Sequence, residues 1–259
     1  MTTPAVAPVL NMLLAQTRSE LLMRWRVPAF SVTNLALPIV FFTFFGLPVA
    51  HVRRADGVSI GAYLLASFGA YAVGNVMVYG FGIGVANERG MKIDRLMRAS
   101  PLPPLVFMLA KVLTALLFSL VALVLLIAFG IVAGGIHQTP AVWATIIVRL
   151  LAGSLPFIGL GFWIGYWSGP NAAPAVANLI YLPLSFASGL FVPVNQLPDF
   201  VRTIAPYLPS YHYAQLAWSA LGAGKEPLGE SLLWLAGYSA LFLTLAVRAY
   251  RREERAKFA

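Results

Sequence analysis

The stretch Ala86-Asn-Glu-Arg-Gly-Met-Lys-Ile-Asp-Arg-Leu-Met-Arg-Ala-Ser-Pro-Leu-Pro-Pro104 is a densely charged segment between two long apolar runs. Its charged residues, six of 19, are Glu88, Arg89, Lys92, Asp94, Arg95 and Arg98. Each flanking run is long enough for a membrane-crossing helix, which needs about 20 apolar residues. Because positive charge concentrates in cytoplasmic loops, residues 86–104 are predicted to form a cytoplasmic loop between two such helices.

The composition of the whole chain indicates a membrane protein. It has 259 residues, of which 59% are hydrophobic and 10% are charged, and its mean hydropathy is +0.80. Soluble domains carry about 25% charged residues, so this chain has too few charges to cover a water-exposed globule of its size. The predicted fold class is all-α: a polytopic membrane protein with one transmembrane domain over residues 1–259.

Six apolar segments are predicted to cross the membrane. They lie at 28–50, 60–85, 105–133, 141–167, 173–194 and 228–248. Pro174 and Pro183 interrupt the fifth segment, but a membrane helix tolerates a proline kink because neighbouring groups can satisfy the freed carbonyls. The start of the chain has no positively charged region before an apolar one, so we expect no cleavable signal peptide.

Two amphipathic segments accompany these helices. Residues 8–27 carry an apolar stripe at helical spacing: Leu10, Leu13, Leu14, Leu21 and Trp25. The stripe favours a helix lying in the cytoplasmic interface, although an ordinary short cytoplasmic helix fits it too. Residues 195–227 are aromatic and broken by prolines, which predicts short external re-entrant helices between the fifth and sixth segments.

Lysine and arginine are distributed unequally across the predicted topology. Thirteen lie on the side of the two termini, whereas the other side has Arg53, Arg54, Arg202 and Lys225. This asymmetry predicts that both termini are cytoplasmic. It also accounts for the net charge of +9, so no nucleic-acid partner is expected. Arg53 and Arg54 contradict the rule locally, with Asp56 as partial compensation.

Catalytic or metal-binding motifs are not recognisable. The chain lacks a GxxxxGK[ST] phosphate-binding loop, an HExxH motif and cysteine. His51, His137 and His212 have no ligand-like spacing and are expected to be interfacial or solvated. Ser154 and Ser188 lack the G-x-S-x-G context of a serine nucleophile. We therefore expect no catalytic residue, no metal and no cofactor bound by this chain.

Few polar side chains fall inside the apolar segments. No Asp or Glu lies midway through one, which disfavours an ion-coupled carrier. Arg149 lies in the fourth segment, where it either snorkels outward or faces inward. Asn75, Asn178 and Ser185 are candidates for lining a translocation path or for joining helices, and joining is the more common role.

Within the charged stretch, a short helix is predicted over residues 87–98. Glu88 and Lys92 have the i,i+4 order that stabilises a helix, and Ser100-Pro101 would end it. Leu96 and Met97 would supply apolar anchors among basic residues, as a helix that docks on another protein requires. A solvated loop is the alternative.

The chain resembles, over nearly its whole length, the permease subunits of type-2 ABC exporters, a superfamily of drug, lipid and polysaccharide exporters. The size, the six-segment layout and the N-terminal interfacial helix match. Two motifs resemble those of the family: Asn87-Glu88-Arg89-Gly90-Met91-Lys92 through Leu96-Met97-Arg98-Ala99-Ser100-Pro101, and Ser188-Gly189-Leu190-Phe191-Val192-Pro193 followed by Leu197-Pro198, Pro206 and Pro209.

The resemblance implies an ATP-driven exporter in a bacterial-type inner membrane. Two permeases, identical or different, would pair, and each would dock a separate ABC ATPase subunit that binds ATP and Mg. The second and fifth segments would open a path between the protomers. The implied coupling residues are Glu88, Arg89, Lys92, Asp94, Arg95, Leu96 and Arg98, with Glu88 and Arg89 binding the interfacial helix or the ATPase. The implied external gate includes Phe191, Pro193, Tyr207 and Tyr211.

The substrate class is constrained only by the apolar, aromatic character of the membrane segments. It favours a small hydrophobic compound or a lipid, and a glycan also fits because aromatic rings stack on sugars. Two other functions suit a polytopic chain: a lipid-modifying membrane enzyme and a non-transporting scaffold. The absence of a carboxylate cluster or a serine–histidine pair argues against the enzyme.

Overall fold

The computed structural model describes residues 8–93 and 102–258, which form helices and no strands. The longer helices are α1 (Val9–Trp25), α2 (Pro28–Phe41), α3 (Ile60–Gly90), α5 (Pro104–Gly134), α6 (Pro140–Ala152), α7 (Leu155–Trp167), α8 (Ala173–Ala187), α10 (Pro209–Ala220) and α11 (Leu228–Phe258). The shorter ones are η1 (Phe42–Gly46), η2 (Leu47–Val49), η3 (Val194–Gln196), α9 (Asp199–Ile204) and η4 (Ala205–Tyr207). The all-α prediction is confirmed.

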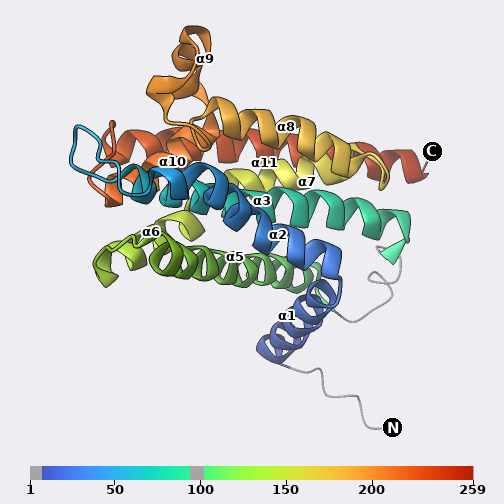
Figure 1. Cartoon of the computed structure of the whole chain (residues 1–259). Helices are drawn as coiled ribbons and strands as arrows, with labels where there is room; N and C mark the ends of the chain where they lie inside the picture. Colours follow the sequence, from blue (N-terminus) through green and yellow to red (C-terminus); the bar gives the residue numbers. More distant parts are fainter. Residues whose placement is uncertain (1–7, 94–101, 259) are drawn as a thin grey trace.

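Helix α3 is the centre of the bundle. Figure 1 shows it running between α5 on one side and α7, α8 and α11 on the other. In an apolar stretch of 18 residues of α3, 94% is buried within the protein, whereas the corresponding stretch of α11 is only 17% buried. Alpha-helix α1, the end of α3 and the end of α11 lie at the same end of the bundle (Figure 1), the arrangement expected if both termini lie on one side of a membrane.

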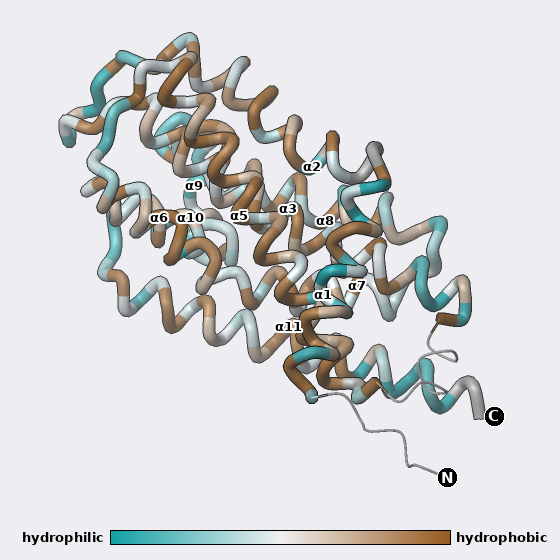
Figure 2. Tube along the Cα trace, turned by 90° about the horizontal axis from the view of Figure 1, so that it is seen from below, coloured by the Kyte–Doolittle hydropathy of each residue, from teal (hydrophilic) through white to brown (hydrophobic). Residues whose placement is uncertain are grey.

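Four stretches of helix are long and apolar enough to cross a membrane: 60–90, 105–134, 140–167 and 228–255. They correspond to four of the six predicted segments. The other two, 28–50 and 173–194, contain shorter apolar helices at Asn34–Val49 and Ala173–Ala187. Hydrophilic residues gather mainly toward the two ends of the bundle (Figure 2). The count of six crossings stays a prediction.

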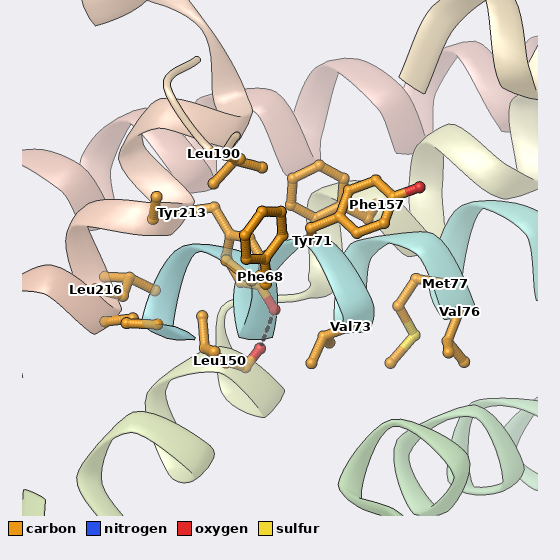
Figure 3. Packing of buried hydrophobic residues seen from close by; sticks show 14 of the residues in the cluster. Phe68, Tyr71, Val73, Val76, Met77, Leu150, Phe157, Leu190, Tyr213 and Leu216 are labelled. Atoms are coloured by element: carbon orange, nitrogen blue, oxygen red, sulfur yellow. Dashed lines mark hydrogen bonds between the residues drawn. The ribbon is translucent and has the colours of Figure 1, made fainter. Parts of the chain in front are cut away.

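The fourth predicted segment is broken into α6 and α7, which the sequence analysis treats as one helix. The break falls at Gly153 and Ser154, two residues before Pro156, which has no N–H to donate to the carbonyl of Ala152. Tyr213 of α10 donates a hydrogen bond to the carbonyl of Leu150 at 2.6 Å (Figure 3). A side chain from another helix therefore satisfies a carbonyl beside the break.

Aromatic rings fill the core around α3. Phe68 and Tyr71 of α3 lie beside Phe157 and Tyr213, which come from α7 and α10 (Figure 3). Tyr181 of α8 packs directly against Gly74 of α3. A Cβ added to Gly74 would lie only 2.2 Å from the Tyr181 hydroxyl. That hydroxyl donates to the carbonyl of Tyr71 at 2.9 Å. Glycine at 74 thus permits the close approach of α8 to α3.

Helix α1 has its polar side toward the protein. Thr17, Glu20 and Arg24 are buried, whereas Leu10 is 63% and Trp25 is 57% exposed. A helix in water would show the opposite arrangement, because apolar surface is driven out of water. The helix predicted at 8–27 is confirmed, and its apolar outer face favours lipid over water as its surroundings.

The segment predicted as external, 195–227, does contain short helices. They are η3, α9, η4 and α10. Helix α10 is almost wholly buried, and it packs against α3, α6 and α11. The short helices are confirmed, while their depth in a membrane stays a prediction.

Candidate functional site

The charged stretch that opens the sequence analysis begins as part of α3. Helix α3 continues through Gly90, and Lys92 then takes a left-handed φ of 57°, which few non-glycine residues adopt. The short helix predicted over 87–98 is therefore wrong at its start, because the first of these residues form the last turn of α3. Asp94, Arg95, Leu96, Met97 and Arg98 lie outside the described residues.

Four charged side chains form a buried group, here called the inner charge cluster: Glu20 and Arg24 of α1, Glu88 of α3 and Lys111 of α5. Lys111 Nζ lies 3.0 Å from Glu20 Oε1 and also pairs with Glu88 Oε1. The Lys111 side chain is 3% exposed and that of Glu88 is 17% exposed. The sequence pattern predicts a Glu88–Lys92 pair, but Glu88 binds a lysine 23 residues away.

Arg24 completes the inner charge cluster. Its Nη2 donates to the carbonyl of Gly80 at 3.3 Å, where the missing side chain of glycine leaves room for the guanidinium. Burial lowers the pKa of Arg24, while Glu20 and Glu88 act in the opposite direction. Two carboxylates and two cations balance each other, as buried charges require.

The inner charge cluster fastens three helices together. Removing one member of a buried ion pair leaves an uncompensated charge and typically destabilises a protein by about 3–5 kcal/mol. Glu88 and Lys111 also stand at the two ends of the polypeptide that joins α3 to α5. Their ion pair holds the two ends of that connection together, and Glu20 attaches α1 to the same lysine.

Arg89 forms a second junction beside the first. Its Nε lies 2.6 Å from Glu253 Oε2 of α11. Its Nη1 donates to the carbonyls of Gly165 and Ser168, the latter at 3.1 Å, where α7 ends. A cation at the C-terminal end of a helix stabilises the exposed carbonyls there. Arg89 therefore links α3 to α7 and α11.

These contacts separate the predicted coupling residues. Glu88 and Arg89 are partly buried and bind other helices of this chain, whereas Lys92 is exposed where α3 ends. Glu88 shares Lys111 with Glu20, so it is joined to the N-terminal helix through that lysine. Their contact with an ATPase stays a prediction.

The polar residues predicted for the path or for packing form hydrogen bonds within the chain. Asn75 donates to Asn34 Oδ1 of α2 at 2.7 Å, and Asn178 of α8 accepts from the hydroxyl of Tyr79. Ser185 donates to the carbonyl of Tyr181 in its own helix at 2.7 Å. Asn75 and Asn178 thus join helices, the role named as more common, and Asn178 is also exposed.

Arg149 binds protein groups on α10. Its Nη1 donates to Ser219 Oγ at 2.8 Å and to the carbonyl of Leu216 at 3.3 Å. Tyr213 of α10 donates in the other direction, to the carbonyl of Leu150. The two helices are therefore joined by hydrogen bonds in both directions, next to the break between α6 and α7.

The residues predicted for an external gate fall into two groups. Phe191 is buried, and its ring centroid lies 4.0 Å from that of Phe186 and 4.9 Å from that of Phe41; Pro193 is buried nearby in sequence. Tyr207 is exposed, and Tyr211 is buried beside Trp218, with ring centroids 6.0 Å apart. Burial, with a contribution from Glu226, raises the pKa of Tyr211 to about 12.

His212 is the main correction among the side chains. The expectation of an interfacial or solvated histidine is wrong, since His212 is 1% exposed. Its ring stacks on that of Trp234 at 5.0 Å, and its Nδ1 lies 3.2 Å from Glu226 Oε2. Burial lowers the pKa of His212 against the opposing effect of Glu226. The stacking contact joins α10 to α11. No local sequence pattern predicts it.

Ser154 and Ser188, which the sequence analysis considers as nucleophiles, both donate hydrogen bonds to nearby backbone carbonyls. Ser154 donates to the carbonyl of Leu151, and Ser188 donates to that of Leu184. Within residues 8–93 and 102–258, no three side chains of His, Asp or Glu are grouped as a metal would require.

Two comparisons with known proteins place the chain. Residues 47–248 match the family described as ABC-2 family transporter protein. The chain is also similar to the putative transport permease YvfS of Bacillus subtilis (strain 168), with 28% identity over 245 residues. That alignment covers 95% of this chain and 99% of the relative.

Proposed function

Because the chain belongs to the ABC-2 family of transporter proteins, we propose that it is the membrane-spanning subunit of an exporter driven by ATP hydrolysis on a separate ABC ATPase. Family membership makes it a multi-pass membrane transport permease and implies the ATPase partner. In the proposal, two permeases pair, the termini lie in the cytoplasm of a bacterial-type cell, and ATP and Mg bind the partner. The lack of a phosphate-binding loop in this chain supports that division.

One observation supports the coupling part of the proposal most directly. The connection between α3 and α5 contains the predicted docking residues, and both of its ends meet in the inner charge cluster. A force applied to this connection by an ATPase would act on a joint that also holds α1. Because a packed interior is stiff, such a displacement would move the attached helices rather than dissipate locally.

Arg89 extends the same joint toward the other side of the bundle. It binds the end of α7 and Glu253 of α11. Movement at the last turn of α3 would therefore reach α1 and α5 through Glu88, and α7 and α11 through Arg89. This arrangement gives the two adjacent residues different roles within one coupling mechanism.

The first test is purification of the tagged chain from its native membranes in mild detergent, followed by identification of what copurifies. We expect an ATPase with a phosphate-binding loop. The double variant Lys92→Glu, Leu96→Asp should lose it, because these changes reverse a charge and remove an apolar anchor of the predicted docking surface. No ATPase with the unaltered chain, even after cross-linking, would overturn the proposal.

The second test separates docking from coupling. Glu88→Gln keeps a hydrogen-bond acceptor and leaves the Lys111–Glu20 pair, so it should retain the ATPase but reduce ATP-driven transport. Asp199→Asn is the matched control, because its pair with Arg202 is exposed and such pairs contribute at most about 1 kcal/mol. Unchanged transport in Glu88→Gln would remove the inner charge cluster from the coupling mechanism.

A further inference from the structure

The N-terminal half of α11 carries a groove that takes no part in the proposed coupling mechanism. It has a volume of about 410 Å³ and is lined by Glu230, Leu233, Trp234, Gly237, Tyr238 and Leu241. These positions recur at spacings of three and four, so they form one face of the helix. The volume is large enough for a small molecule, which would remain exposed on the open side of the groove.

Gly237 keeps the groove open. A Cβ built at this position would have no atom within 4 Å. Trp234 and Tyr238 also line the groove and stack on each other, with ring centroids 6.1 Å apart and an angle of 24° between the rings. The groove therefore has a stretch of bare backbone beside one aromatic surface made of two stacked rings.

The two stacked rings are held by contacts with neighbouring segments. Trp234 stacks on the buried His212 of α10 and meets the ring of Tyr207 edge-on at 6.2 Å. The hydroxyl of Tyr238 donates to the carbonyl of Tyr207. These contacts fix both rings before a ligand arrives, so binding does not have to order them.

The charge at one end of the groove is negative. Glu230 is exposed, and within residues 8–93 and 102–258 its carboxylate has neither an ion pair nor a hydrogen bond. Glu226 lies one turn before it and pairs with His212. Leu233 and Leu241 continue the groove away from Glu230. The site is thus amphiphilic, with a carboxylate at its polar end and apolar and aromatic groups beyond.

We propose that this groove binds an amphiphile with a single aliphatic chain and a cationic amine or quaternary ammonium head. The head would lie beside Glu230, since carboxylates attract cations. The exposed edges of Trp234 and Tyr238 would contact the first part of the aliphatic chain, because the faces of both rings are stacked on neighbouring rings. The chain would follow Leu233 and Leu241. An anionic head would be repelled by Glu230. The proposal requires no ATPase, so its failure is distinct from failure of the exporter proposal.

Quenching of tryptophan fluorescence tests binding directly. The full chain in phosphatidylcholine nanodiscs is titrated with an alkyltrimethylammonium that carries bromine on its chain. The contribution of Trp234 is obtained by subtracting the signal of Trp234→Phe. We expect saturable quenching of Trp234 by the ammonium compound. Alkyl sulfate of the same chain and bromine position should bind at least tenfold more weakly, and equal quenching by the two would overturn the proposal.

Two glycines of α11 give a matched pair of variants. Gly237→Leu fills the groove, whereas Gly229→Leu adds the same side chain in open space outside it. Both changes favour helix over glycine, so neither is expected to unfold α11. Gly237→Leu should weaken ammonium binding at least tenfold and Gly229→Leu should leave it unchanged. Equal affinities of the two variants would contradict the groove as the site.

The headgroup contact has its own variant. Glu230→Gln should weaken binding of the ammonium compound about two- to fivefold, the effect of one screened charge contact, and leave binding of an uncharged alkyl maltoside unchanged. A second copy of the chain is the competing occupant. Because the chain has no cysteine, Leu233→Cys can be oxidised in membranes, and an efficient disulfide-linked dimer would overturn the proposal.

Discussion

At one end of α3, Glu88 shares Lys111 with Glu20, so helices are joined there by buried ion pairs. Toward its other end, Tyr63 stacks on Trp218 with ring centroids 4.7 Å apart, and Trp218 donates to Ser67 at 2.8 Å. Ion pairs depend strongly on geometry and charge balance, whereas stacked rings tolerate small displacements and contribute about 0.5–1.5 kcal/mol per pair. After the predicted topology we call these the inner and the outer end of α3. The comparison predicts a joint that is sensitive to displacement at the inner end and a more tolerant scaffold at the outer end.

The largest expected effect is on the inner joint. Lys111→Met leaves Glu20 and Glu88 buried without their common cation, so we expect a loss of about 3–5 kcal/mol in the free energy of unfolding. Thermal unfolding of the purified protein measures it. Arg202→Met removes one partner of an exposed pair and serves as control. Similar unfolding temperatures for the two variants would break the contrast between the two ends.

The next effect concerns the outer scaffold. Tyr213→Phe removes the donor to the carbonyl of Leu150 and should destabilise the protein by about 1–3 kcal/mol, the usual effect of a buried group without its partner. Tyr207→Phe, at an exposed ring, should have no effect. Hydrogen exchange of α6 and α7 would locate the change, and faster exchange confined to α11 would count against this account.

Packing at the middle of α3 can be tested apart from both ends. Gly74→Ala places a methyl group against Tyr181, and such overpacking costs about 1–3 kcal/mol. Gly169→Ala has open space at its Cβ and should be neutral. If both variants unfold at the same temperature as the unaltered protein, α8 is free to move away from α3.

The smallest expected effect is a pH dependence at the outer end. Because burial lowers the pKa of His212, the folded state binds fewer protons there than the unfolded state near pH 6.5, the ordinary histidine pKa. Stability should therefore rise with pH through this region and fall as the pH drops below it, by at most about 1.4 kcal/mol per unit of pKa difference. His212→Gln should flatten the profile between pH 5 and 7; an unchanged slope would assign it to other groups.

Continuous apolar runs were sufficient to predict α3, α5 and α11, because membrane-crossing length and hydropathy are local properties. The sequence does not predict the break between α6 and α7, although it shows Gly153 and Pro156. Whether a proline breaks a membrane helix or only kinks it depends on partners from other helices, such as Tyr213 here. For the same reason, the sequence pairs Glu88 with Lys92 one turn further on, while the structure pairs it with Lys111. Contacts that depend on the packing of distant helices leave no periodicity in the sequence.

The inward polarity of α1 has a consequence for how the protein is made. Glu20 is synthesised 91 residues before Lys111, so α1 emerges from the ribosome long before the cation that neutralises it in the folded protein. Until α5 is inserted, Glu20 lacks the lysine with which it pairs in the folded protein. The N-terminal helix is therefore expected to reach its final place late in biogenesis, after the helix on which it rests.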